Sequence, residues 1–180
     1  MHARSIVTAT IVAAMSVSVG SAAAQQITTE TVAGVNNFRR LETTVACAGA
    51  TTASAAPEIA AMGFKSIINL RQSSEPGVDI GAATAAAKAA GIRYYHIPLD
   101  GSAPEPAVAD RFIAAITSDG SEPAFIHCAG GNRAAAMWMI KRLVVDGWDA
   151  DRAGAEATAL GMRSENLKQF AIDYARTHRR

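Results

Sequence analysis

The stretch EPAFIHCAGGNRAAAMW, residues 122–138, decides how this chain can fold and what it can do. Its apolar run ends at His127 and Cys128, and Arg133 stands five positions after the cysteine. The apolar run predicts a buried strand over residues 123–128, and apolar residues at helical spacing predict a helix over residues 132–145. A short loop therefore has to join the end of a strand to the first turn of a helix.

This loop has the composition of an anion site. Four residues lie between Cys128 and Arg133, namely Ala129, Gly130, Gly131 and Asn132. Glycines allow the positive φ angles of a sharp turn, and N–H groups at a helix start bind anions. The same positive field favours the thiolate of Cys128, while Arg133 can offer two parallel donors to an oxyanion. The plain alternative is a buried core cysteine, a glycine turn and a surface arginine.

Strands and helices alternate along most of the chain. We predict further strands over residues 43–47, 65–70 and 92–97, and helices over residues 54–63, 79–90, 106–118, 150–160 and 164–177. Strands that are apolar along their whole length and alternate with helices indicate an α/β fold, with a central, mostly parallel sheet flanked by helices. In such sheets ligands bind at the carboxyl ends of the strands, which here are residues 70–71, 98–100 and 127–128.

The segment HCAGGNR resembles the phosphate-binding loop of cysteine-dependent phosphatases. The resemblance places Cys128 at the nucleophile and Arg133 at the phosphate-binding arginine. The chain departs from the family in two respects. Four residues separate the two side chains where five are common, and Ala134 stands where many members have Ser or Thr. A gap of four is also found in many rhodanese-type sulfurtransferases, whose cysteine carries a persulfide.

Other segments favour the phosphatase. NFRRL, GFKSIINLR, GIRYYHIPLD and GWDADRAGAEATALG are similar to bacterial dual-specificity-like phosphatases, including the phosphatase-like domain of beta-lactamase-hydrolase-like proteins, where a gap of four is familiar. The resemblance covers about residues 37–161 and implies the three-layer sandwich of cysteine phosphatases. After its active-site helix a rhodanese would turn into a short strand, whereas this chain continues into two predicted helices.

The resemblance also implies roles for residues outside the loop. Asp100, in IPLD, matches the segment that carries the general acid, although Asp100 and Gly101 also form a good turn signal. Glu105 and Asp110 are reserve acids on the same segment. The implied reaction requires neither a metal nor another cofactor.

Several polar residues next to the predicted strands are candidate supporting residues. His127 resembles the histidine that orients the loop or tunes the thiolate, and it could equally be a buried histidine with its hydrogen bonds satisfied. Asn69 either braces the loop or serves as a turn residue at the end of its strand. Arg71 and Glu75 either line the rim of the pocket or, as we favour, form an ion pair that stabilises the loop.

The chain has two cysteines, Cys47 and Cys128. In an oxidising compartment they could form a disulfide. We favour one reactive thiol, Cys128, and one buried and inert thiol, Cys47, because only the surroundings of Cys128 suit a thiolate.

The first residues have the pattern of a secretory signal peptide. Basic Arg4 precedes an apolar stretch over residues 6–19, which is followed by small residues at 22–24. An uncleaved membrane anchor is the alternative, but the apolar stretch is shorter than the ~20 residues that span a bilayer. We therefore expect an exported, periplasmic protein with a signal peptide (1–24), a flexible arm (25–36) and a phosphatase-like domain (37–180).

The charges of the chain are nearly balanced, with 17 Lys and Arg against 16 Asp and Glu and no basic stripe. This balance gives no reason to expect a nucleic-acid partner. We expect a monomer, without a membrane span after signal cleavage, that hydrolyses phosphorylated proteins or small phosphomonoesters. The alternatives are a sulfurtransferase with a Cys128 persulfide and a non-catalytic phosphate-binding module.

Overall fold

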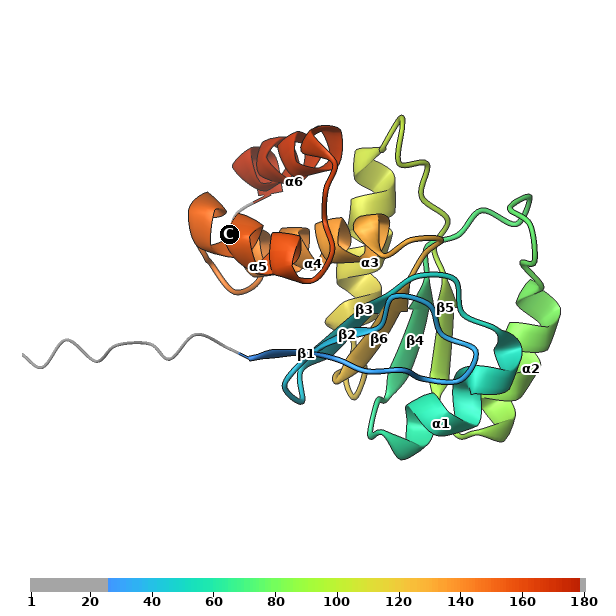
Figure 1. Cartoon of the computed structure of the whole chain (residues 1–180). Coiled ribbons are helices and arrows are strands. Elements are labelled where there is room, and N and C mark those ends of the chain that lie inside the picture. Colours follow the sequence, from blue (N-terminus) through green and yellow to red (C-terminus); the bar gives the residue numbers. More distant parts are fainter. Residues whose placement is uncertain (1–25, 179–180) are drawn as a thin grey trace, which may run out of the picture.

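The computed structural model describes residues 26–178, so the predicted signal peptide lies outside the described residues. A six-stranded sheet in the order β1-β2-β3-β6-β4-β5 forms the central layer, and helices cover both of its faces (Figure 1). Within the described range, no helix combines the length and the apolar character needed to cross a membrane.

Four parallel strands form the main part of the sheet: β3 (Val45–Ala48), β6 (Ala124–His127), β4 (Ser66–Asn69) and β5 (Arg93–His96). All four were predicted from their sequence: the structure trims β4, β5 and β6 by one residue at each end, whereas β3, predicted over residues 43–47, begins two residues later and ends one residue later. The residues of β3, β4 and β6 are buried throughout, as expected for strands with helices on both sides.

The edge of the sheet next to β3 corrects the prediction of a flexible arm over residues 25–36. β1 (Ile27–Thr29) pairs antiparallel with β2 (Arg39–Leu41), which pairs antiparallel with β3. Val32 and Val35, between the two strands, are buried. The sequence of this segment is mostly polar because β1 is an edge strand with little core to cover, and so it lacks the apolar pattern on which strand prediction depends.

The helices form two unequal layers. The short η1 (Ala53–Ala55) and the helices α1 (Ala56–Ala61) and α2 (Ile80–Ala89) pack on one face. On the other face lie α3 (Pro106–Ile116), α4 (Asn132–Val144), α5 (Ala150–Ala159) and α6 (Glu165–His178) (Figure 1). The sandwich predicted from the sequence is confirmed, including the two helices after α4.

Strand register decides which side chains reach each helix layer. Ala48, His127, Asn69 and His96 are paired in one row across β3, β6, β4 and β5. Paired residues of parallel strands point to the same face, and their chain neighbours point to the other. His127 therefore faces the α1–α2 layer, whereas Cys128 belongs to the core under α3–α6.

The helix that follows the loop, α4, is fixed firmly in place. Ten of its thirteen residues are buried. Near its carboxyl end the Arg142 Nε donates to Glu156 of α5 at 2.7 Å, and the Trp138 Nε1 donates to the same carboxylate at 2.6 Å. Because α4 is held along its length, the loop at its amino end has a rigid base.

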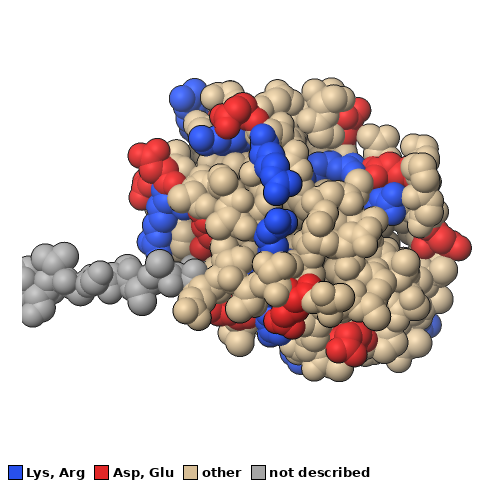
Figure 2. All heavy atoms as spheres, viewed as in Figure 1, with Lys and Arg blue, Asp and Glu red and all other residues tan. Residues whose placement is uncertain are grey.

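The surface carries both signs of charge. In Figure 2 basic and acidic side chains are interspersed on the face shown, with a run of basic ones near its centre. This distribution agrees with the formal net charge of +1.

Candidate active site

The loop between β6 and α4 closes on the sulfur of Cys128. Gly131, the N-cap of α4, has φ of +98°, a conformation that side chains with a Cβ rarely adopt. In this conformation its N–H group points back along the loop and donates to Cys128 Sγ at 3.1 Å. Cys128 is 1% exposed, so the sulfur lies at the base of the loop. Of the predicted glycine pair, only Gly131 uses a positive φ.

A second segment supports the loop from the side, and sequence reasoning missed it. The Ala50 N–H donates to the Ala129 carbonyl at 2.8 Å, and Asn37 Nδ2 donates to the Gly130 carbonyl at 3.3 Å. A Cβ on Gly49 would lie 2.9 Å from the Ala129 oxygen, so only glycine allows this approach. The run of small residues after β3 was the available signal.

Arg133 is held in place by Glu75. Arg133 Nη1 and Nη2 donate to the two carboxylate oxygens at 2.7 and 3.0 Å, and Nη1 also donates to the Leu99 carbonyl at 2.9 Å. A guanidinium has five N–H groups in a planar fork. These bonds leave Nε–H and the second Nη2–H, which are parallel and suit two oxygens of one oxyanion.

Glu75 is the centre of a larger cluster of charges. Arg71 Nε donates to it at 3.1 Å, and the Gln72 N–H donates at 2.8 Å, which confirms the ion pair favoured from the sequence. Hydrogen bonds from Arg133, outweighing burial, lower the pKa of Glu75 from 4.5 to about 2. Burial opposes the charge of Arg133, but Glu75 and Cys128 together raise the pKa of Arg133 above its ordinary value.

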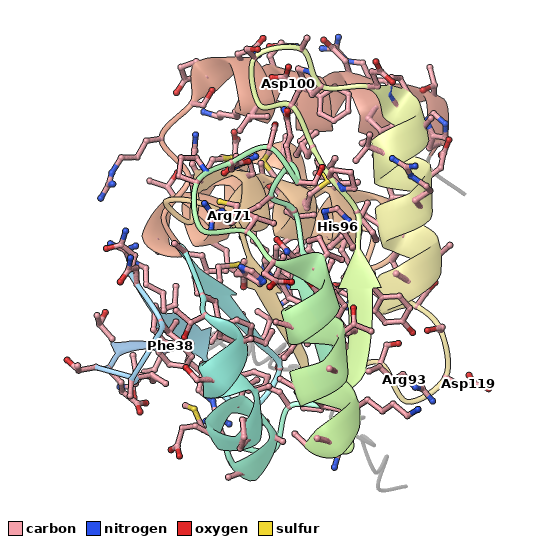
Figure 3. The ribbon with its side chains drawn as sticks, turned by 90° about the vertical axis from the view of Figure 1, so that its right-hand side faces the viewer. Phe38, Arg71, Arg93, His96, Asp100 and Asp119 are labelled. Carbon is pink, nitrogen blue, oxygen red and sulfur yellow. The ribbon has the colours of Figure 1, made fainter. Side chains whose placement is uncertain are left out.

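Asp100 lies on the loop after β5, beside Arg133 but exposed. Figure 3 shows Asp100, Arg71 and His96 toward the carboxyl end of β5, while Arg93 and Asp119 lie at the opposite end. Asp100 Oδ1 accepts from the Ser102 hydroxyl at 2.6 Å and from the Ser102 N–H at 2.9 Å. These hydrogen bonds lower the pKa of Asp100, so its carboxylate is ionised at neutral pH.

The two reserve acids are placed differently. Glu105 caps α3 through its backbone and lines the same open depression as Asp100, of about 430 Å³. Asp110 accepts from the Tyr174 hydroxyl at 2.6 Å, and both line a depression beside Val144, at the far end of α4. Asp110 is therefore not brought to the loop.

The supporting residues act on different parts of the site. Asn69 braces the segment after β4: its Oδ1 accepts from the Arg71 N–H at 2.9 Å, so it does not hold the Cys128 loop directly. His127 is buried, and its Nδ1 has no hydrogen-bond partner within residues 26–178. The prediction of a satisfied buried histidine is therefore wrong for this nitrogen.

Asn132 connects the loop to the helices behind it. Its Oδ1 accepts from the Arg163 N–H at 2.7 Å and from the Ser164 N–H at 3.2 Å, in the link between α5 and α6. The link between the two helices that distinguish the chain from a rhodanese is therefore hydrogen-bonded to Asn132 of the loop.

Both cysteines are free. Cys47 is fully buried in β3, and burial raises the pKa of its thiol, with a smaller contribution from Cys128. This agrees with an inert Cys47. Among the described residues there is no group of three or more His, Cys, Asp or Glu side chains arranged to hold a metal ion.

Known structures share this fold. A DUF442 protein from Shewanella putrefaciens CN-32 superposes with a TM-score of 0.68 at 16% identity, over 82% of this chain and 96% of that chain. TpbA from P. aeruginosa, in a cysteine-to-serine variant in complex with phosphotyrosine, gives a TM-score of 0.61 at 18% identity, over 87% and 91%. The fold is therefore that of the protein tyrosine phosphatase class.

The sequence gives the family. Residues 37–144 match the family of the beta-lactamase hydrolase-like protein, phosphatase-like domain, and the chain belongs to it. A beta-lactamase hydrolase-like protein from Agrobacterium fabrum is 38% identical over 89 residues, which are 47% of this chain and 20% of that protein. The chain thus matches about a fifth of the length of such curated relatives.

The Glu75 cluster predicts a pH dependence of stability. A carboxyl whose pKa is lower in the folded protein stabilises it above its unfolded pKa, and this stability is lost as the pH falls toward the folded pKa. With a pKa of about 2 in the folded protein against 4.5, this contribution is lost as the pH falls from about 4.5 to about 2. The free energy of unfolding in urea, measured across this pH range, should show this loss of stability in the wild type. Glu75→Gln, which has no carboxylate to protonate, should lack it.

The matched control is Glu58→Gln, which removes an exposed carboxylate from the first turn of α1. It should keep the wild-type dependence on pH. An equal loss of stability in acid for the wild type and Glu75→Gln would mean that the Arg133–Glu75 pair does not hold the site together.

Proposed function

We propose that the protein is a phosphomonoester hydrolase of the tyrosine and dual-specificity phosphatase type, which acts through a phosphocysteine on Cys128. The observation that carries the proposal is the pairing of two features at one point. The Gly131 N–H reaches the Cys128 sulfur, and Glu75 holds Arg133 so that two parallel N–H groups remain for an oxyanion.

The first step forms the phosphocysteine. The Cys128 thiolate attacks phosphorus in line with the ester oxygen, so that an S–P bond forms and the P–O bond breaks. The amides of residues 129–132 and the free side of Arg133 stabilise the equatorial oxygens in the transition state. The leaving oxygen takes a proton from Asp100.

The second step restores the enzyme. Water attacks phosphorus, its proton passes to the Asp100 carboxylate, and the S–P bond breaks to give phosphate and the Cys128 thiolate. Ala134 offers no hydroxyl to help the thiolate leave, which makes this step the slower one in the proposed cycle. His127, Asn69 and Arg71 act as positioning residues in the strands and turn beneath the loop.

The substrate follows from the open surroundings of the loop. The depression beside Asp100 is about 430 Å³ and lined mostly by polar residues, which suits an exposed phosphorylated side chain or a small phosphate ester. The phosphotyrosine bound to TpbA supports a phosphotyrosine-like substrate. With export directed by residues 1–24, these substrates would be met in the periplasm.

A sulfurtransferase is the second candidate, because many rhodanese-type sulfurtransferases have the same four-residue gap as that between Cys128 and Arg133. It would need a sulfur donor and no general acid. A non-catalytic anion-binding module would need neither the thiolate nor the acid. The sulfurtransferase predicts that Asp100→Asn leaves sulfur transfer unchanged, and the anion-binding module predicts no phosphate release from the wild type or any variant.

Hydrolysis of an aryl phosphate by the reduced, metal-free protein should depend on both loop side chains. Cys128→Ser should abolish turnover, since the hydroxyl is a far weaker nucleophile at neutral pH. Arg133→Ala should lower kcat/KM by about 10²–10³, the usual cost of removing a donor to the transition-state oxyanion. Arg133→Lys should not restore it, because an ammonium cannot bind two oxygens side by side.

Thiosulfate:cyanide sulfur transfer, measured on the same samples, provides the control. Sulfur transfer in the absence of phosphate release would favour the second candidate. Full aryl phosphatase activity in Cys128→Ser would exclude the phosphocysteine altogether.

The acid role of Asp100 predicts a pH profile. Asp100 must be protonated to act, and hydrogen bonds from Ser102 lower its pKa, so kcat should be highest in acid and fall as the pH rises. Ser102→Ala removes the hydroxyl hydrogen bond, which raises the pKa of Asp100 and moves this fall to higher pH. Asp100→Asn should lower kcat by about 100-fold, and its kcat should no longer decrease as the pH rises.

Ser73→Ala, which removes a hydroxyl from the same open depression, is the matched control and should leave the profile unchanged. If Ser102→Ala also leaves it unchanged while Asp100→Asn stays active, a different group donates the proton. Glu105→Gln would then be the next variant to measure.

A further inference from the structure

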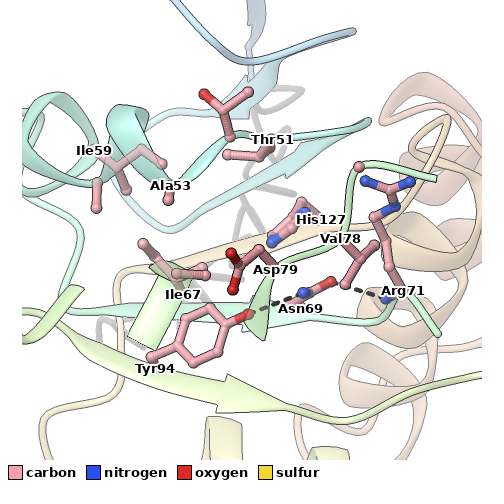
Figure 4. Close-up of a pocket in the computed structure, with 14 residues that line it drawn as sticks. Thr51, Ala53, Ile59, Ile67, Asn69, Arg71, Val78, Asp79, Tyr94 and His127 are labelled. Atoms are coloured by element: carbon pink, nitrogen blue, oxygen red, sulfur yellow. Dashed lines mark hydrogen bonds between the residues drawn. The ribbon is translucent and has the colours of Figure 1, made fainter. Parts of the chain in front are cut away.

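A second pocket lies on the face of the sheet away from the Cys128 sulfur (Figure 4). Its volume is about 110 Å³, and its walls come from η1 and α1, the start of α2, and the strands β4, β5 and β6. The exposed residues Thr52, Gly77 and Asp79 line it as well and form its mouth. No step of the proposed phosphatase reaction uses this space.

The ring of His127 forms part of the inner wall. The residue is 4% exposed, and the register of the sheet turns it to the α1–α2 face. Figure 4 shows the ring facing the same space as Thr51, Asp79 and Tyr94. Its Nδ1 has no hydrogen-bond partner among residues 26–178. A buried polar atom without a partner is costly, so a partner that enters the pocket would be stabilised there.

Arg71 and Asp79 line the pocket too, but their side chains have partners within the protein. Arg71 donates to Glu75 and to the Pro76 carbonyl. Asp79 accepts from the Ala82 N–H.

His127 and Tyr94 are the groups that suit a neutral hydroxyl. Burial, Arg71 and Arg133 together lower the pKa of His127 to about 3, so the imidazole is uncharged at neutral pH. The Tyr94 oxygen accepts from Asn69 Nδ2 at 2.9 Å, which leaves the hydroxyl proton of Tyr94 available to a ligand. A hydroxyl group could donate to one of these side chains and accept from the other.

Apolar side chains also line the pocket. Among them are Ile59, Ile67, Ala53, Val78 and Ala83. One water molecule occupies about 10–15 Å³ by this kind of measure and needs two to four polar partners. The pocket is several times larger, and most of its surface offers no such partner. Benzene binds in a cavity of about 150 Å³, so a single small ring in this pocket of about 110 Å³ would extend into its open mouth.

We propose that this pocket is a binding site for a small neutral amphiphile, an apolar ring bearing one hydroxyl, whose hydroxyl is bound by His127 Nδ1 and Tyr94. The ring would lie against Ile59 and Ile67. The site is distinct from the oxyanion loop, because it opens on the other face of the sheet, yet its main polar contact is the residue next to Cys128.

Phenol is the probe for this proposal. Long-range ¹H–¹⁵N spectra of the intact protein, labelled on histidine nitrogens, should show a saturable shift of the His127 Nδ1 resonance. A ligand of seven heavy atoms should bind with a Kd on the order of 1 mM. Toluene, which lacks the hydroxyl, should bind more weakly and leave Nδ1 nearly unmoved, and this comparison needs no variant.

Two substitutions on α2 provide the matched variants. Ala83→Leu fills the pocket and should weaken phenol binding at least tenfold. Ala85→Leu places the same side chain on the exposed side of the same helix and should leave binding unchanged.

Inorganic phosphate separates this site from the loop, since phosphate should occupy the loop and leave the phenol shift unaltered. The proposal is overturned if phenol gives no saturable shift, because the pocket then holds only water. It is also overturned if phosphate displaces phenol, or if toluene moves Nδ1 as phenol does.

Discussion

The bidentate pair between Arg133 and Glu75 is the interaction on which the site depends. Arg133 starts α4, Glu75 follows β4, and the Leu99 carbonyl from the segment after β5 accepts from the same guanidinium. One side chain therefore ties together the ends of three strands at the ligand edge of the sheet. The pair also orients the guanidinium, because the two nitrogens that hold Glu75 leave a fixed pair of N–H groups facing the loop. A lysine could supply a positive charge here but not two N–H donors in a fixed, parallel orientation.

The sequence predicted the central strands, the later helices and the Cys128–Arg133 loop because each depends on local patterns. Apolar runs, helical spacing and glycine positions carry that information within a dozen residues. The partners of the loop were harder to predict. Glu75 was assigned to Arg71, four residues away, and its stronger link to Arg133 spans 58 positions. Gly49 and Asn37 support the loop from the far side of β3, and only the register of the sheet brings them there. The edge strand β1 was taken for an arm because its polar sequence has no core to cover.

His127, the last residue of β6, and Cys128, the residue after it, face the two proposed sites. Cys128 turns toward α4 and the oxyanion loop, while His127 turns toward the α1–α2 layer and the second pocket. This follows from the alternation of side chains along a strand, which places neighbours on opposite faces. Arg71 is shared between them, since it binds Glu75 behind the loop and lines the second pocket. A ligand in that pocket would therefore contact residues that support the candidate active site without covering the Cys128 sulfur.

The most direct test of the account is the chemical state of Cys128 during turnover. The reduced protein is mixed with excess aryl phosphate and quenched in acid within one turnover. After digestion, mass spectrometry gives the mass of the peptide that contains Cys128. We expect the mass of one phosphoryl group on this peptide, absent from Cys128→Ser and more abundant than in a phosphatase with a hydroxyl after the arginine, because Ala134 slows the second step. An unmodified Cys128 during active hydrolysis, or a persulfide formed from thiosulfate with no phosphoryl adduct, would contradict the account.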